Sequence, residues 1–170
     1  MDINIAIARS CSSKVWHNKA TTWTEFVQKL RNPYRTKETA EEFKNMDSES
    51  KGKIKNCIGG FVGGRLVSDG PRNKSNLKSR RLLTLDIDYC NYDIRPKIEA
   101  MGVVCCVYST HSHSADNIRL RVIIPLDRDV NPQEYQAISR MVASKIDIEI
   151  FDITTHEPER LMFWPSTSID

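Results

Sequence analysis

The sequence predicts a mixed α+β domain built on a mainly antiparallel sheet flanked by helices. Helical and alternating hydrophobic patterns take turns along the 170 residues without an internal repeat. Several connections between the expected strands are short, as antiparallel neighbours allow. The chain is 39% hydrophobic, which suits one globular domain. We expect a single domain over 1–170, with a helical or αβ part over 1–57 and the catalytic core over 58–170.

The N-terminal part carries clear helix signals. Thr22 followed by Glu25 is a capping box, and the helix that it opens should stop at Asn32 and the proline after it. A second, highly charged helix is expected over 37–46. The segment 58–67 contains four glycines among apolar residues, which predicts hairpin-like strands or a glycine-rich turn.

The core is expected to continue with strands and two helices. An asparagine, a proline and a glutamate at 131, 132 and 134 form a helix start. The expected elements are a strand over 82–90, a short helix over 96–101, strands over 103–111 and 118–126, a helix from 131, and strands over 146–152 and 161–164.

The strand LLTLDIDYC, residues 82–90, places two carboxylates inside an otherwise apolar run. Residues two apart in a strand share a face, so Asp86 and Asp88 should point away from the leucines and isoleucine between them. Their spacing of roughly 6–7 Å lets both reach one cation, and without a cation they repel each other. We therefore expect positive charge between them.

Further polar residues occur near the ends of later strands. In YSTHSH, Ser109 and His111 should share a strand face, and Asp152 follows the apolar run ending at residue 151. Three carboxylates suit two Mg²⁺ or Mn²⁺ ions, because hard cations prefer oxygen ligands. Arg119 and Arg121 should share one face of the neighbouring strand, where guanidinium groups suit phosphate oxygens.

The formal net charge of +3 is too small to identify a nucleic-acid binder, but basic residues gather in one segment. RLVSDGPRNKSNLKSRR, residues 65–81, has six basic residues and one acid. It is either a solvated connection or a phosphate-contacting surface. Candidates for contacts with template or phosphate are Arg72, Lys74, Lys78 and, nearer the C-terminus, Arg160.

LLTLDID, STH and FD followed by ERLMFWPS together resemble the motif series of the archaeo-eukaryotic primase superfamily, in particular phage and plasmid primase-polymerase domains. The resemblance spans roughly 58–166 and implies a palm like that of RNA-recognition motifs. It implies template-directed nucleotidyl transfer, as a DNA primase or polymerase, by a two-metal mechanism. The residues implied are listed by role: Asp86, Asp88 and Asp152 as catalytic ligands of two Mg²⁺ or Mn²⁺ ions, and Ser109, His111, Arg121 and Arg119 as nucleotide-binding residues.

The resemblance also implies partners. Nucleoside triphosphates, either dNTPs or NTPs, and single-stranded or primed DNA would be the substrates. The chain would be the N-terminal portion of a longer replication protein of a phage, plasmid or other mobile element, with a helical priming domain and a helicase. Asp86→Ala should abolish transfer and leave the fold intact, because it relieves repulsion between carboxylates.

A cytoplasmic location without a membrane partner is expected. Five cysteines without CxxC spacing suit a reducing compartment. No apolar run approaches the length of a membrane span, and the N-terminus lacks the pattern of a signal peptide.

Two other functions remain open. A rolling-circle replication nuclease of the HUH type would use a histidine pair, a metal and a tyrosine nucleophile, here His111, His113 and Tyr135. A non-catalytic nucleic-acid-binding module with an RRM-like sheet would present aromatic side chains on its open face, whereas this chain offers acids there.

Overall fold

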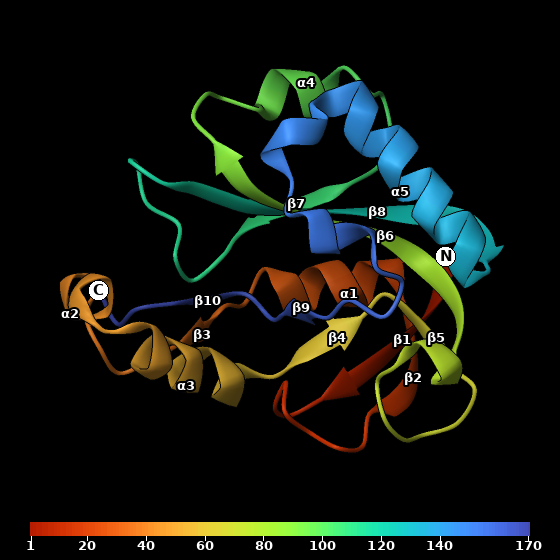
Figure 1. Cartoon of the computed structure of the whole chain (residues 1–170), viewed down its shortest axis with the longest axis horizontal. Helices are drawn as coiled ribbons and strands as arrows, with labels where there is room; N and C mark the ends of the chain where they lie inside the picture. The colour runs from red at the N-terminus through yellow and green to blue at the C-terminus, as the bar shows by residue number, and fades with distance from the viewer.

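The computed structural model describes all 170 residues, which form two four-stranded antiparallel sheets, a short parallel strand pair and five α-helices (Figure 1). The first sheet has the order β2-β1-β4-β9, the second β5-β6-β8-β7, and β10 pairs with β3. The elements are β1 (Asp2–Ala8), β2 (His17–Thr22), α1 (Trp23–Leu30), β3 (Tyr34–Arg35), α2 (Ala40–Asn45), α3 (Ser48–Ile58), β4 (Gly60–Val62), β5 (Gly64–Leu66), β6 (Leu77–Cys90), α4 (Arg95–Glu99), β7 (Cys106–Ser109), β8 (Ile118–Val130), α5 (Pro132–Ile146), β9 (Met162–Phe163) and β10 (Ser166–Thr167). None of the helices combines the length and apolarity needed to cross a membrane.

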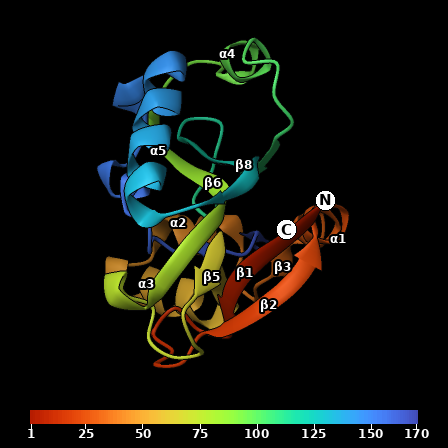
Figure 2. The same ribbon diagram turned by 90° about the vertical axis from the view of Figure 1, so that its right-hand side faces the viewer.

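The second sheet confirms the predicted fold class. Its chain order β6–α4–β7–β8–α5 is the β-α-β-β-α sequence of an RRM-like or ferredoxin-like unit. All of its strand pairs are antiparallel, and β5 takes the edge position beside β6. Figure 2 shows α4 and α5 on the same side of this sheet. The opposite side is therefore left for the functional residues and for contact with the N-terminal part.

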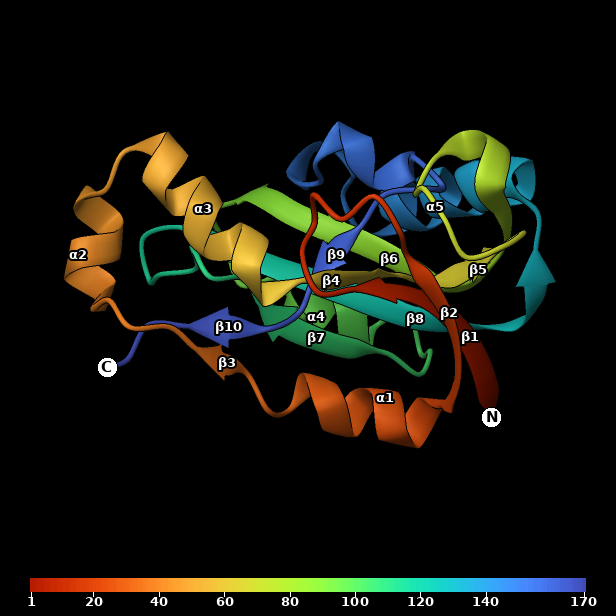
Figure 3. The ribbon, with the colours of Figure 1, turned by 90° about the horizontal axis from the view of Figure 1, so that it is seen from below.

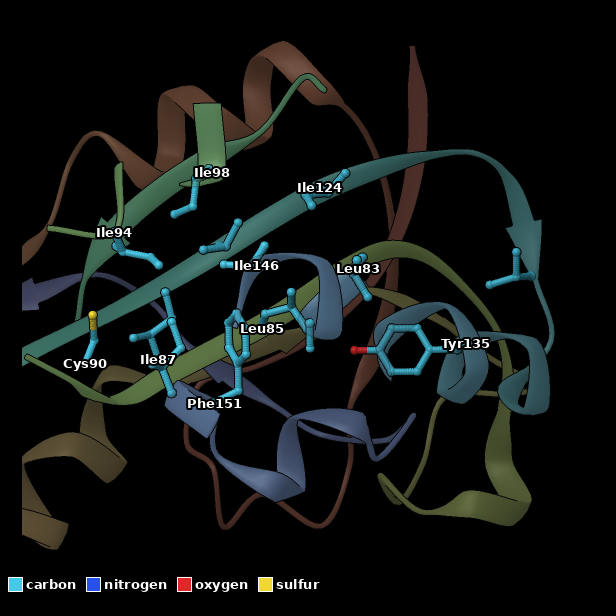
Figure 4. Packing of buried hydrophobic residues seen from close by; sticks show 14 residues of the cluster. Leu83, Leu85, Ile87, Cys90, Ile94, Ile98, Ile124, Tyr135, Ile146 and Phe151 are labelled. Atoms are coloured by element: carbon cyan, nitrogen blue, oxygen red, sulfur yellow. The ribbon is translucent and has the colours of Figure 1, made fainter. Parts of the chain in front are cut away.

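The main hydrophobic cluster fills the space between this sheet and its helices. Leu83, Leu85 and Ile87 of β6 are fully buried and point toward α5 and the segment after it, as Figure 4 shows. Tyr135 on α5 and Phe151 close the cluster. Since alternate residues of β6 fill the core, the residues between them face the other side of the sheet.

The N-terminal part is less helical than expected, because it begins with a β-hairpin. β1 and β2 pair antiparallel from Asp2 opposite Thr22 to Ile7 opposite His17. The predicted capping box is present: the Thr22 side chain accepts from the backbone N–H of Glu25, whose carboxylate accepts from Thr22 N–H. The hairpin was missed because its second strand, HNKATT, has no apolar alternation.

The glycine-rich segment 58–67 is a crossing between the two sheets, so the hairpin interpretation is wrong. β4 joins the first sheet and β5 the second, with Gly63 between them. A Cβ on Gly64 would lie 2.0 Å from the Ser79 carbonyl oxygen. Only glycine lets the two backbones approach this closely.

Three predicted strands differ in extent or nature. The segment 146–152 is not a strand: α5 runs to Ile146, a 3₁₀ turn follows at Ile148–Ile150, and Phe151 forms only an isolated bridge with Ile87. Apolar alternation resembles a strand here, yet the edge of β6 is already paired with β5 over much of its length. The strands expected over 103–111 and 161–164 are shorter, covering Cys106–Ser109 and Met162–Phe163.

Candidate active site

Two arginines of β8 face the two aspartates of β6. Asp86 lies opposite Arg121 in the register of the sheet, and Arg121 Nε is 3.2 Å from Asp86 Oδ1. Arg119 Nη1 is 3.0 Å from Asp88 Oδ1. The predicted shared faces of the acids and of the arginines are both found, and the positive charge beside the acids is supplied by the protein itself.

Asp152 lies at the border of this group. Its backbone N–H donates to the Asp86 carbonyl at 2.9 Å, and its carboxylate accepts from Arg160 Nη2 at 2.9 Å and from the N–H of Thr154. Burial raises the pKa of Asp88, and the nearby carboxylates of Asp86 and Asp152 raise it further, against the opposing effect of Arg119. The three carboxylates thus act on one another electrostatically although they come from two separate segments.

These groups surround a pocket of about 160 Å³. Its lining residues are Lys55, Ile58, Asp86, Asp88, Thr110, His111, Arg119, Arg121, Arg160, Phe163 and Ser166. Four cationic side chains therefore face two carboxylates across the pocket. Burial lowers the pKa of Lys55, and the neighbouring Arg119 and Arg121 lower it further. The excess of positive charge favours an anionic ligand.

His111 lines the pocket, but both of its ring nitrogens already have protein partners. Nε2 lies 3.0 Å from Glu38 Oε1 and Nδ1 lies 3.0 Å from Ser166 Oγ. Hydrogen bonds, chiefly from the Thr36 hydroxyl, hold the pKa of Glu38 below its ordinary value despite burial, so its carboxylate only accepts. Nε2 then carries the proton, and Nδ1 accepts from the Ser166 hydroxyl. A phosphate contact by His111 requires the release of one of these bonds.

Ser109 does not line the pocket. β7 ends at Ser109, which pairs with Leu120 and is exposed, while Tyr108 pairs with Arg121 on the site face. His111 follows in a turn, so the expectation that it shares a strand face with Ser109 is wrong. Thr110, between them, lines the pocket instead.

Among the four basic candidates, only Arg160 reaches the pocket. Arg72 Nη1 donates to the Glu159 carbonyl at 2.8 Å, and its guanidinium lies over the Trp16 ring at 5.4 Å. Lys74 and Lys78 are exposed and do not line the pocket.

Sequence reasoning missed three polar residues around the pocket. Lys55 comes from α3, whose segment has no buried residue and therefore no clear hydrophobic stripe. Glu38 and Ser166 lie next to the short strands β3 and β10, whose pairing no local pattern indicates. Asp47, which caps α3 by accepting from Ser50 N–H, was the one local signal for the helix that carries Lys55.

The carboxylates have the chemistry to hold divalent cations, although the arginines engage them in this structure. No group of three or more Asp, Glu, His or Cys side chains is arranged as a ready metal site. A carboxylate has about four lone-pair positions, so Asp86 can keep Arg121 and still offer an oxygen. Arg119 and Arg160 are about one-third exposed and have room to leave Asp88 and Asp152. The donor set therefore fits hard cations once these two arginines move.

Comparison with known proteins adds a family and one similar structure. The sequence matches the VapE N-terminal domain family over residues 1–170. No curated protein sequence matches the chain. Among solved structures, the chain is similar to the AEP domain of the primase-polymerase of cyanophage S-2L, with a TM-score of 0.47 and 14% identity, covering 96% of this chain and 71% of that chain.

Proposed function

The chain belongs to the family of VapE N-terminal domains, and we propose that it is a nucleotidyltransferase that extends DNA from nucleoside triphosphates on a template. The observation that carries the proposal is the pairing of Asp86 and Asp88 with Arg121 and Arg119 across one pocket. Metal ions with a triphosphate offer the complementary charges: cations for the carboxylates, and phosphate oxygens for the guanidinium groups.

We assign the pocket residues to separate tasks. Asp86, Asp88 and Asp152 would hold two divalent ions, Mg²⁺ or Mn²⁺. Such a pair of ions activates the attacking hydroxyl and stabilises the leaving pyrophosphate. Arg121 stays with Asp86 and fixes its orientation, because both side chains are less than 10% exposed.

The remaining cations are assigned to the triphosphate. Arg119, Arg160 and Lys55 are placed to bind its oxygens. Arg119 and Arg160 would exchange a carboxylate partner for a phosphate, and Lys55 would give up its hydrogen bond of 2.8 Å to Ser112. His111 acts as a structural support of the pocket wall until one of its two hydrogen bonds is released.

The geometry counts against the nuclease alternative. Tyr135, the nucleophile candidate, is fully buried, and its hydroxyl donates to the Thr84 carbonyl at 3.2 Å. His113 Nδ1 accepts from the backbone N–H of Arg119, while His111 is held by Glu38. Neither a reachable tyrosine nor a histidine pair is therefore present at the site.

The binding-module alternative fits no better. An RRM-like module binds bases by stacking them on aromatic residues of the open sheet face. Here the corresponding face carries Asp86, Asp88, Arg119 and Arg121. Tyr108 on the same face is buried, with its hydroxyl donating to the Phe163 carbonyl.

Primer extension tests the proposal. The wild-type chain, a primed single-stranded template, dNTPs and Mg²⁺ or Mn²⁺ should give extension, and Asp88→Asn and Asp152→Asn should each reduce its rate by more than about 100-fold. Asparagine keeps the size and an acceptor oxygen, so Asp152→Asn still caps Thr154. Asp93→Asn is the matched control, because Asp93 is an exposed acid paired with Arg95 away from the pocket.

Two outcomes would overturn the proposal. Extension that is unchanged in both aspartate variants would exclude these carboxylates from the reaction. Metal-dependent cleavage of the single strand in place of extension would restore the nuclease. Absence of both extension and nucleotide binding would favour the binding module.

A further inference from the structure

A second, larger hollow lies beside the candidate active site. It is an open groove of about 830 Å³ between α1, the β1–β2 hairpin and the end of α3. Figure 3 shows α1 running back from the end of β2, which places the helix along one side of this hairpin. Its lining residues are Ile5, Ile7, Ala8, Arg9, His17, Lys19, Ala20, Thr21, Glu25, Phe26, Lys29, Cys57, Ile58 and Trp164. We call this hollow the hairpin groove.

The charge of the hairpin groove is positive and largely uncompensated. Arg9, Lys19 and Lys29 are exposed, and no carboxylate lies within ion-pair distance of them. His17 is paired with Asp69. Glu25, the acid of the groove, accepts from Thr21 Oγ1 and from Thr22 N–H at the start of α1. Three free cations around an apolar floor are thus available to an anionic ligand.

Trp164 gives the groove a flat aromatic surface. Its ring lies 4.7 Å from that of Phe61 and 6.0 Å from that of Phe26, and these neighbours hold it in place. The Lys29 ammonium lies 4.5 Å from the Trp164 ring centre. An aromatic surface with a cation beside it is the combination that single-strand binders use for bases and phosphates.

The hairpin groove adjoins the active-site pocket. Ile58 lines both, and Phe163 of the pocket is the neighbour of Trp164 in the groove. A chain lying in the groove is therefore led along Trp164 and Ile58 toward Asp86 and Asp88. The 160 Å³ pocket is small beside this groove, so the groove offers the larger space for an extended substrate.

We propose that the hairpin groove binds single-stranded DNA and guides the template toward the carboxylates, an inference that rests on the proposed function. A single strand presents both bases and phosphates, which suit the apolar floor and the basic rim respectively. A duplex presents mainly its phosphates and leaves the apolar floor unused. The ligand class is thus a single-stranded polynucleotide, and its recognition needs Lys19, Lys29 and Trp164 together.

Fluorescence anisotropy with a labelled oligothymidylate of about 12 nucleotides tests the proposal on the whole chain. Lys19→Glu with Lys29→Glu should weaken binding by at least tenfold. The slope of log affinity against log salt should become shallower by about 1.4, since each lost contact with a single strand contributes about 0.7. Arg140→Glu with Lys145→Glu on α5 makes the same charge change at two exposed residues outside the groove and should change affinity less than twofold.

Further arms separate the possible failures. Equal weakening by the groove pair and the α5 pair would overturn the groove, as would weakening only by Lys74→Glu with Lys78→Glu in the basic segment. Competition by a duplex or by inorganic polyphosphate as strong as that by the unlabelled oligonucleotide would exclude a role for exposed bases. Asp88→Asn should still bind the strand, so the loss of extension with retained binding distinguishes the reaction from the groove. Extension and binding that both survive the groove substitutions would leave the proposed function standing and overturn this inference alone.

Discussion

Asp86 and Arg121 form an enclosed ion pair, with side chains only 8% and 9% exposed. Arg121 Nη1 also donates to the Phe163 carbonyl at 3.2 Å, so the guanidinium links β8 to β9. Burial alone would lower the pKa of Arg121, but the Asp86 carboxylate raises it above its ordinary value. The stability of this guanidinium inside the fold therefore depends on Asp86.

We predict that Asp86→Ala destabilises the metal-free protein by about 3–5 kcal/mol, because it leaves a buried charge without a partner. This is the opposite of the expectation that removing Asp86 only relieves repulsion. Asp88→Ala removes a more solvated partner of Arg119 and should cost less than about 1 kcal/mol. Urea unfolding of both variants measures the difference, and equal losses would contradict the assignment of Arg121 to the interior.

His111 makes the stability dependent on pH. Burial lowers its pKa below the ordinary 6.5, although the adjacent Glu38 opposes the shift. The nearby cations are Lys55 and Arg119 across the pocket, and the other contacts are Ser166 and the Phe43 ring. The unfolded chain takes up a proton at this histidine near pH 6.5 while the folded chain does not.

The contribution of neutral His111 is consequently complete above about pH 6.5 and is lost as the pH falls toward the lower folded pKa. We expect the melting temperature of the wild type to fall between pH 7.5 and 5.5 more steeply than that of His111→Gln. The comparison is needed because burial also lowers the pKa of His156, which both proteins keep. Parallel curves for the two proteins would contradict a neutral His111.

At the scale of elements, the sequence predicted strands whose alternation coincides with a buried face. β6 and β8 could be identified because each alternates apolar core residues with acids or arginines, and this pairing brought Asp86 and Arg121 together. The segment 147–152 has the same alternation but no open sheet edge to join. Lys55 and Glu38 reach the pocket through tertiary packing, which local patterns do not encode. Ser109 failed for a simpler reason: a turn one residue early changes which side chain enters the site.

The crossing between the sheets depends on Gly64. We predict that Gly64→Ala costs about 3 kcal/mol or more, since a Cβ would lie 2.0 Å from the backbone oxygen of Ser79 and β5 would have to leave β6. Gly52→Ala is the matched control: Gly52 lies inside α3 with nothing within 4 Å of its Cβ position, so alanine should stabilise by about 0.5–1 kcal/mol. Denaturant midpoints of the two variants measure both signs. Similar effects at both positions would contradict the close backbone approach.

On the scale of the whole molecule, the two sheets meet at the site. One hydrophobic cluster contains residues of both: Ile3, Ile5, Phe26, Leu30, Phe61, Leu82, Tyr108, Ile123 and Met162. The pocket beside this cluster takes Lys55 from α3, Asp86 and Arg121 from the second sheet, and Ser166 from β10. A ligand in the pocket therefore contacts segments that are distant in the sequence and held together mainly by this packing.

Such a ligand should stabilise the molecule as one unit. With Mn²⁺ and a dNTP at about 100 times the dissociation constant, the free energy of unfolding should rise by about 2.7 kcal/mol, or roughly 5–10 °C in melting temperature. The metal alone should do less, because Arg119 and Arg160 compete for the carboxylates until phosphate oxygens receive them. Deoxynucleoside without phosphates is the control ligand, and Asp88→Asn should remove most of the shift. A full shift with the unphosphorylated nucleoside, or in Asp88→Asn, would contradict joint binding of metal and phosphate between the two sheets.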